Sequence, residues 1–260
     1  MDLLSALILG VVEGVTEFLP VSSTGHLILT ARFLGLSQTE FLKSFEIMIQ
    51  LGAILAVVVV YARSLLIRVE VLKRLLAAFI PTGVVGLVLY KFIKKFLLGN
   101  VHVVVASLFL GGLFLVLFEK FYREEAGDKE DLSRLSYRDA VLIGLCQSLA
   151  MVPGVSRSAA TIIGGLLLGL RRKTIVEFSF LLAIPTMLAA SAFDLLKSTG
   201  DVSWGEGALS SLAVGFLSSF VVAMMSIKFF LHFIQRHNFT IFGFYRILAA
   251  AAFYIFLRGA

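Results

Sequence analysis

The chain has 260 residues, of which 59% are hydrophobic and only 15% are charged. Ordinary soluble domains carry about 25% charged residues, so this composition excludes a water-soluble globular protein and predicts a polytopic membrane protein. The formal net charge of +6 does not indicate a nucleic-acid partner, because membrane proteins gather excess Lys and Arg on their cytoplasmic loops.

The first predicted element is too short to cross a membrane. An apolar run from Leu3 to Val12 leads into Glu13, Glu17 and Pro20, and a second short apolar piece follows at 27–34. Apolar runs of about 10–14 residues are typical of re-entrant segments. We therefore expect a helix–loop–helix hairpin that enters and leaves the membrane on the same side.

Six later stretches are long enough to cross about 30 Å of hydrocarbon as helices. A second short pair, at 140–152 and 159–170, lies between the third and the fourth of them and flanks a polar tip. The predicted fold is an all-α polytopic membrane protein with six transmembrane helices and two re-entrant hairpins. The expected spans are 44–62, 75–91, 101–118, 176–193, 207–227 and 240–257.

The two hairpins resemble each other at an offset of 134 residues. Gly10 matches Gly144, Glu13 matches Gln147, and Ser22 matches Ser156. Each hairpin precedes three spans, an odd number, so the second copy is inverted relative to the first. We expect one membrane domain over 1–260, built from repeat 1 (about 1–118), a connector (about 119–138) and repeat 2 (about 139–260), with its site near the bilayer midplane.

The distribution of Lys and Arg predicts the orientation. Loops on one side, including 63–74, 119–138 and 171–173, carry fourteen basic residues, and those on the other side carry seven. The positive-inside rule places the richer side in the cytoplasm. Both termini and the mouth of the first hairpin are then expected outside the cytoplasm.

The first hairpin carries candidate acid–base groups. Glu13 and Glu17 are four residues apart and share a helical face. Two carboxylates at membrane depth need a divalent ion, a proton or Arg157 to compensate them, unless the helix lies at the interface and they are solvated. His26, just after the tip, is a candidate proton donor or acceptor, although a lone histidine is more often structural.

The two tips are candidate anion sites. Each stands before a new half-helix, whose free N–H groups and dipole attract phosphate. Arg157 can bind phosphate oxygens bidentately, although it could instead snorkel or merely neutralise Glu17. The candidate anion-binding residues besides Ser23 and Arg157 are Ser22, Thr24, Gly25, Ser156, Ser158 and Gln147.

Other polar residues in apolar stretches are weaker candidates. Glu46 and Glu177 are predicted either to support the site or to hydrogen-bond another helix. Asp194 and Arg246 lie near predicted span ends, where we expect them to be solvated.

Two runs carry a specific resemblance: EGVTEFLPVSSTGH (13–26) and QSLAMVPGVSRSAATI (147–162). They closely resemble the two signatures of the undecaprenyl-pyrophosphate phosphatase family linked to bacitracin resistance, and FEIMIQLGAILAV (45–57) and EFSFLLAIP (177–185) extend the likeness over most of the chain. Ala159 departs from an expected glycine.

The resemblance implies hydrolysis of undecaprenyl pyrophosphate to the monophosphate, which recycles the carrier lipid of cell-wall synthesis in the bacterial inner membrane. It implies catalytic importance for Glu13, Glu17, Ser23, His26 and Arg157. It also implies a divalent cation, Mg²⁺ or Ca²⁺, for which Glu13 and Glu17 are the candidate ligands, and a polyprenyl pyrophosphate as the partner. The chain could also form a homodimer.

Two mechanisms and one rival function stay open. Ser23 is the preferred nucleophile with His26 as its base, or metal-bound water attacks directly while Ser23 holds phosphate. The rival is an ion-coupled anion transporter or a lipid flippase, because inverted repeats with broken helices are also typical of transporters. A type-2 phosphatidic-acid phosphatase is rejected, since no Arg-Pro element occurs and the next histidine after Arg157 is His232.

Overall fold

The computed structural model describes residues 1–67, 69–93, 97, 100–124, 131–198 and 207–259. All regular structure in these ranges is helical, which confirms the predicted all-α class. The long helices are α3 (Glu40–Ile67), α4 (Val69–Phe92), α5 (Val101–Phe121), α8 (Arg172–Ser198), α9 (Ala208–Phe233) and α10 (Thr240–Gly259). The short ones are α1 (Leu3–Thr16), α2 (Ser23–Phe33), α6 (Tyr137–Ser148) and α7 (Arg157–Leu167), with 3₁₀ turns at Leu132–Arg134 and Leu149–Met151.

The six long helices are each long and apolar enough to cross a membrane, which confirms the six predicted spans. The four short helices have 11 to 14 residues. At about 1.5 Å per residue they reach only about 21 Å, too little to cross, so they are compatible with the predicted re-entrant hairpins. Arg68, Lys94, Lys95 and Lys129, which contributed to the charge count, lie outside the described residues.

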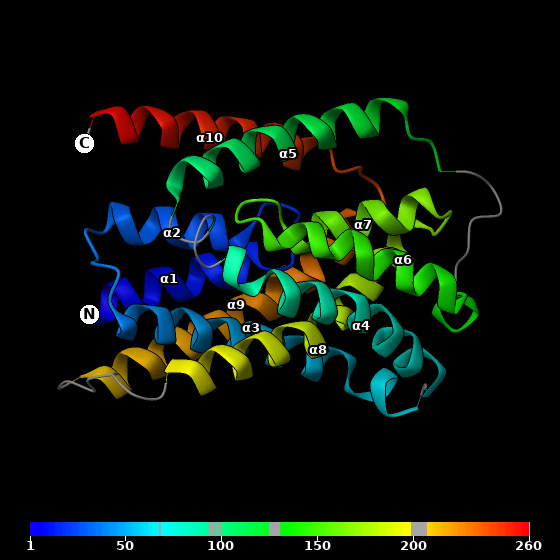
Figure 1. The fold of residues 1–260 in the computed structure, drawn as a ribbon, viewed down its shortest axis with the longest axis horizontal. Helices are drawn as coiled ribbons and strands as arrows, with labels where there is room; N and C mark the ends of the chain where they lie inside the picture. Colours follow the sequence, from blue (N-terminus) through cyan, green and yellow to red (C-terminus); the bar gives the residue numbers. More distant parts are fainter. Residues whose placement is uncertain (68, 94–96, 98–99, 125–130, 199–206, 260) are drawn as a thin grey trace.

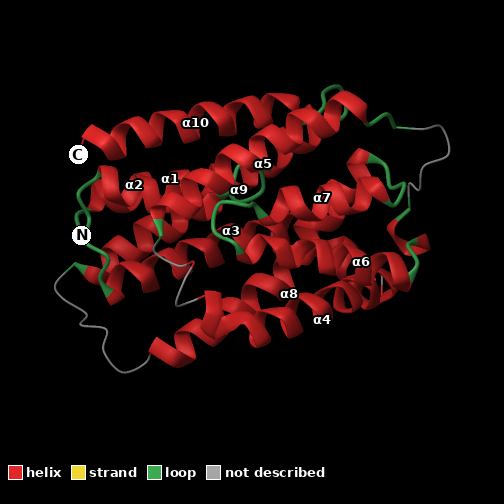
Figure 2. Cartoon of the chain, turned by 45° about the horizontal axis from the view of Figure 1, so that its top comes forward, coloured by secondary structure: helices red, strands yellow, loops and turns green. Residues whose placement is uncertain are grey.

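The two short helix pairs occupy opposite halves of the molecule along its long axis, and both chain termini lie at one end (Figure 1). Helix α1 packs against α9, and α6 packs against α4. The first helix of each predicted copy thus pairs with the fourth helix of the other copy. Helices α5 and α10 lie side by side at one edge of the bundle (Figures 1 and 2). This exchange is what two copies related by a two-fold axis would produce; the division into repeats stays a prediction.

Matched glycines permit both of these pairings. A Cβ atom on Gly10 of α1 would meet the carbonyl oxygen of Gly215 on α9, and one on Gly144 of α6 would meet the carbonyl oxygen of Ala78 on α4. Small residues let helices approach closely in membranes, where no hydrophobic effect drives them together. The two glycines are those that the offset of 134 aligns.

Aromatic packing anchors the end of the first hairpin. Phe18, just after α1, is fully buried in the largest hydrophobic cluster. Its ring meets the edge of Phe180 on α8, with ring centroids 5.2 Å apart and planes at 77°. Edge-to-face contacts of this kind are favourable because of the ring quadrupole. Glu17, the residue before Phe18, is therefore held against the core.

The expectation that Arg246 is solvated is wrong. Its side chain is 0% exposed, and its guanidinium donates to backbone carbonyls. Arg246 lies in the second turn of α10. Gly111 and Gly112 of α5 face it and leave room that any side chain would fill, because a Cβ atom on either would collide with Arg246.

Candidate active site

The two hairpin tips are the segments that lead into α2 (17–24) and into α7 (152–158). They share an unusual backbone conformation. Ser22 and Ser156 both have a φ of 75°, and they are the only non-glycine residues with positive φ in the described part of the chain. Each directly precedes a short helix, α2 or α7. Non-glycine residues in such regions cost about 1–3 kcal/mol, and they cluster at functional sites. The predicted repeat aligned these two serines, but nothing in the sequence indicated their strain.

The tips touch at the centre of the molecule. The hydroxyl of Ser158, on α7, donates a 2.8 Å hydrogen bond to the carbonyl oxygen of Phe18. The guanidinium of Arg157 makes a 3.3 Å ion pair with Oε1 of Glu17. Residues 140 positions apart in the sequence are therefore joined directly.

Glu17 also binds the hydroxyl that the sequence predicts as a nucleophile. Ser23 Oγ donates to Glu17 Oε2 over 2.5 Å, and both side chains are buried. One carboxylate thus accepts from Ser23 with one oxygen and from Arg157 with the other. A carboxylate within hydrogen-bond reach of a hydroxyl can remove its proton when that hydroxyl attacks.

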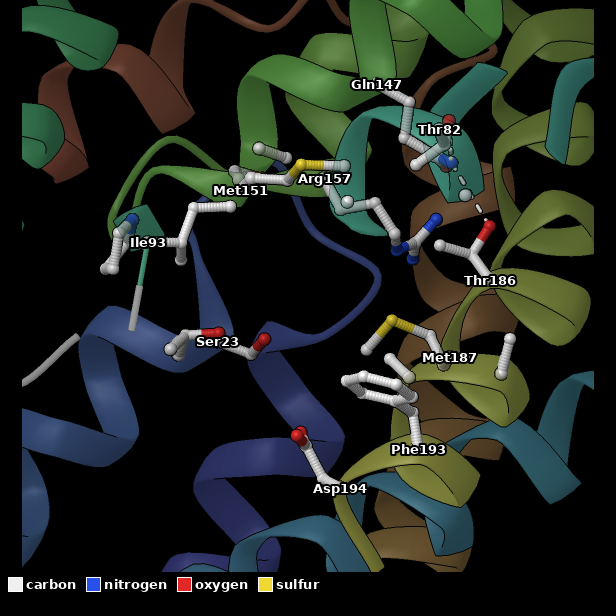
Figure 3. Close-up of a pocket in the computed structure, with 18 of the residues that line it drawn as sticks. Ser23, Thr82, Ile93, Gln147, Met151, Arg157, Thr186, Met187, Phe193 and Asp194 are labelled. Atoms are coloured by element: carbon white, nitrogen blue, oxygen red, sulfur yellow. Dashed lines mark hydrogen bonds between the residues drawn. The ribbon is translucent and has the colours of Figure 1, made fainter. Parts of the chain in front are cut away.

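Arg157 keeps part of its guanidinium free. Its NH1 donates to the carbonyl oxygen of Ser179 at 2.8 Å, and its NH2 faces Glu17. Its buried Nε has no hydrogen-bond acceptor among the described residues. Figure 3 shows the guanidinium pointing into the cavity between the side chains of Gln147, Thr186 and Met187. A guanidinium with unused donors is suited to bind phosphate oxygens.

Both tips line one cavity of about 550 Å³. Its polar end contains Glu17 and Ser22, Ser23, Thr24, Gln147, Ser156 and Arg157. Its apolar wall comes from α4 and α8, mostly from their C-terminal halves, and includes Phe79, Leu87, Tyr90, Met187 and Phe193. A cavity that is apolar along one wall and lined at one end by hydroxyls and a cation suits a ligand with an anionic head and an apolar tail.

Two threonines that the sequence reasoning missed complete the polar end. Gln147 donates from Nε2 to Thr82 Oγ1 and to Thr186 Oγ1, each over 3.1 Å. Both threonines line the cavity. Each directly follows a proline inside a spanning helix, Pro81 or Pro185, which is the signal that could have identified them.

The structure does not bring His26 to Ser23. Its Nδ1 lies 2.7 Å from the carbonyl oxygen of Ser22, and its Nε2 lies 2.8 Å from the hydroxyl of Tyr245. A carbonyl can only accept, so Nδ1 carries the proton, and in the neutral imidazole Nε2 then accepts from Tyr245. His26 therefore links the carbonyl of the strained Ser22 to Tyr245 on α10. The group that contacts the Ser23 hydroxyl is Glu17.

Three other predicted residues stand outside the cavity lining. Gly25 packs on α5, where a Cβ atom would lie 3.3 Å from Val104. The hydroxyl of Ser158 is used by the Phe18 carbonyl. Glu13 lies one helical turn before Glu17, fully buried, and neither of its oxygens accepts a hydrogen bond from a described residue.

The carboxylates of Glu13 and Glu17 fit a small divalent cation. Two buried oxygens without donors, on Glu13, are what an oxygen-preferring ion or a proton would satisfy. The described residues contain no group of three His, Cys, Asp or Glu side chains that could hold a metal. Mg²⁺ is commonly bound by one or two carboxylates together with substrate phosphates and water, a mode that needs no group of three such side chains.

The chain is similar over nearly its whole length to proteins of one known family. Residues 6–252 match the family described as "Bacitracin resistance protein BacA". A protein of Aquifex aeolicus named undecaprenyl-diphosphatase is 55% identical over 96% of this chain and 98% of its own length. Proteins with the same name from Sulfurihydrogenibium and from Methanococcus aeolicus are 51% and 43% identical, over 98% and 95% of this chain and 99% and 96% of their own lengths.

Proposed function

Because this chain belongs to the bacitracin resistance protein BacA family, we propose that it is an undecaprenyl-diphosphatase, which hydrolyses undecaprenyl pyrophosphate to undecaprenyl phosphate and inorganic phosphate. The observation that carries the proposal is Glu17, which bonds Ser23 and Arg157 at the polar end of a cavity with an apolar wall. The diphosphate lies at the polar end, and the first part of the lipid tail lies between α4 and α8.

The diphosphate is held from both hairpins. Ser22 has no side-chain cap bond to α2, so the first N–H groups of that helix are free to bind phosphate oxygens. Arg157 adds a guanidinium with an unused Nε–H donor. These fixed donors stabilise the charge on the transferred phosphoryl group, which is the main protein contribution to phosphoryl transfer.

Ser23 is the nucleophile in the first step. Its Oγ attacks the terminal phosphorus, its proton passes to Glu17, and the bond from that phosphorus to the bridging oxygen breaks. Undecaprenyl phosphate leaves with the bridging oxygen and its electron pair. Before the second step, Glu17 releases the proton from Ser23 to solvent. Water then attacks the phosphoserine and gives a proton to Glu17, which passes it to Ser23 Oγ as the bond from Oγ to phosphorus breaks and inorganic phosphate leaves.

A divalent cation, if bound, would be held by Glu13 and Glu17 and would neutralise charge on the phosphate oxygens. The Glu13 carboxylate supports this assignment, because its oxygens have no donor in the described part of the chain. Within the chain itself, Arg157 offsets the charge of Glu17.

We also propose that the cavity opens on the extracytoplasmic side of the inner membrane. It extends toward Tyr90 and Asp194, near the C-terminal ends of α4 and α8. The positive-inside rule assigns those ends, and both termini, to the outside. With Cys146 replaced by serine, labelling of a Gly207→Cys variant with a membrane-impermeant thiol reagent tests this orientation, and labelling only in inverted vesicles would contradict it.

The activity is tested by phosphate release from undecaprenyl pyrophosphate by the purified chain in detergent. Release without any ion gradient is expected of a phosphatase. Absence of release, together with substrate uptake or lipid movement in vesicles, would instead favour the transporter or flippase.

A further inference from the structure

The geometry points to Arg246 as a positioning residue that holds the two hairpin tips in register for phosphoryl transfer. The inference rests on the proposed function, and it concerns a residue that the mechanism above does not use. Arg246 belongs to neither tip, does not line the cavity, and is 0% exposed.

Arg246 donates to three separate segments. Its NH1 reaches the carbonyl oxygens of Pro20, in the first tip, at 3.3 Å and of Val155, in the second tip, at 3.2 Å. Its NH2 reaches Gly154, also in the second tip, at 2.9 Å. NH2 and Nε also reach the carbonyl oxygens of Ser107 and Leu108 on α5, at 3.1 and 3.4 Å.

The acceptors at Pro20, Gly154 and Val155 belong to the segments that carry the two strained serines. Pro20 is two residues before the strained Ser22, and Val155 directly precedes the strained Ser156. Carbonyls near these tips cannot be satisfied by regular helix bonds, and a buried unpaired carbonyl is costly. One planar guanidinium satisfies carbonyls of both tips and thereby fixes the distance between them.

Arg246 makes no ion pair with a described residue. Every hydrogen bond that it makes to a described residue goes to a backbone carbonyl. No carboxylate of the described residues neutralises its positive charge, which therefore favours the binding of an anion between the two tips. The neighbouring Tyr245 binds His26, so one turn of α10 supports the first tip twice.

A lysine cannot replace this arrangement. Its ammonium donates from a single point, whereas the five carbonyls lie on three segments around a planar fork. Arg246→Lys keeps the charge and loosens the tips. A displacement of about 1 Å at reacting groups costs about 10²-fold in rate, so kcat is expected to fall by about 10²-fold, with a smaller change in KM because the lipid tail still binds.

The test measures kcat and KM for undecaprenyl pyrophosphate in Arg246→Lys and in Gly111→Ala. The second variant retains the Arg246 side chain but displaces its guanidinium, because the added methyl group would collide with it. The control is Arg172→Lys, since Arg172 is a largely buried guanidinium that pairs with Glu119, away from both tips. In parallel, with the free Cys146 replaced by serine, spin labels at Thr24→Cys, in the first tip, and Ala150→Cys, just before the second, measure the distance between the tips.

We expect kcat to fall in both variants and the distance distribution to broaden, while Arg172→Lys changes neither. Unchanged kcat and an unchanged distance in folded Arg246→Lys or Gly111→Ala, with an active wild type, would overturn the assignment. A wild type that releases no phosphate refutes the proposed function. The positioning role of Arg246 then stands if the distance distribution broadens in the two variants and falls if it does not. A loss of thermal stability alone, with both readouts unchanged, means that Arg246 is only structural.

Discussion

Arg157 and Glu17, which lie 140 residues apart in the sequence and belong to different hairpins, form an ion pair of 3.3 Å. The same carboxylate accepts a hydrogen bond from Ser23. A phosphate-binding cation, a base and a nucleophile are therefore linked through one side chain. Each partner of this link can be removed separately.

Replacing Glu17 by glutamine is expected to lower kcat by about 10²–10⁴-fold, the usual contribution of a positioned general base. Glutamine keeps the size of the side chain but cannot take the proton from Ser23. The measurement is steady-state phosphate release over a range of substrate concentrations.

The matched control is Glu119→Gln. Glu119 is also a buried carboxylate paired with an arginine, Arg172, and it accepts from the backbone N–H of Phe239. Breaking this pair should destabilise the fold by about 3 kcal/mol without lowering kcat in the folded fraction. Equal losses of kcat in the two variants would show that the effect of Glu17 is only structural.

Ser23→Ala is expected to abolish nearly all turnover, because the covalent path loses its nucleophile. Acid quenching during turnover, followed by mass spectrometry, should detect a phosphoserine at Ser23 in the wild type. Ser210→Ala removes an exposed serine hydroxyl that bonds only its local turn, and it should leave turnover unchanged. If Ser23→Ala keeps most of the activity, the covalent path is excluded and direct attack by water is favoured.

Arg157→Lys is expected to lower kcat/KM by about 10²–10³-fold, the typical loss for one donor aimed at a developing negative charge. Lysine cannot bind the Ser179 carbonyl and Glu17 together and still present a planar donor to phosphate. Arg74→Lys is the control, since Arg74 also bonds a carbonyl and a glutamate, those of Leu135 and Glu70. Wild-type kcat/KM in Arg157→Lys would contradict the phosphate-binding role.

Gly10→Ala is expected to destabilise the fold by about 1–3 kcal/mol, because the added methyl group meets the Gly215 carbonyl where α1 crosses α9. Unfolding in a denaturing detergent measures the change. In Gly83→Ala the nearest atom, of Phe79, would lie 3.6 Å from the new Cβ, so stability should hardly change. Equal stability of both variants and wild type would mean that α1 and α9 do not cross at Gly10.

Removing divalent ions with a chelator is expected to abolish phosphate release, and added Mg²⁺ should restore it. In Glu13→Gln the Mg²⁺ concentration for half-maximal activity should rise by at least about tenfold, since one carboxylate ligand is lost. Direct Mn²⁺ binding, measured by electron paramagnetic resonance, should weaken in parallel. Unchanged ion dependence and unchanged Mn²⁺ binding would exclude Glu13 as a ligand.

Hydropathy and length were enough to predict the membrane fold. The six spans follow from apolar runs long enough to cross the hydrocarbon, and the structure has six helices at those places. The offset of 134 residues also aligned Ser22 with Ser156, the two residues with the same positive φ. Local composition and spacing carry this information because they decide which segments span and where chains turn.

The roles of Arg246 and His26 could not be predicted in this way. Arg246 appears in the sequence as a basic residue near a span end, and only the packing of α10 on Gly111 and Gly112 encloses it. His26 is next to the tip in sequence, but the rotation of α2 turns its ring toward Tyr245 on α10. Both outcomes depend on contacts between distant helices, for which one sequence holds no signal.

The central claim is that both hairpins hold one diphosphate, and a structure of the chain with a prenyl methylenebisphosphonate, a diphosphate analogue that cannot be hydrolysed, tests it most directly. The account predicts a single bisphosphonate bound by the Arg157 guanidinium and the N-terminus of α2, with its terminal phosphorus next to Ser23 Oγ. A bisphosphonate bound to one hairpin alone, or outside the cavity between α4 and α8, would contradict it.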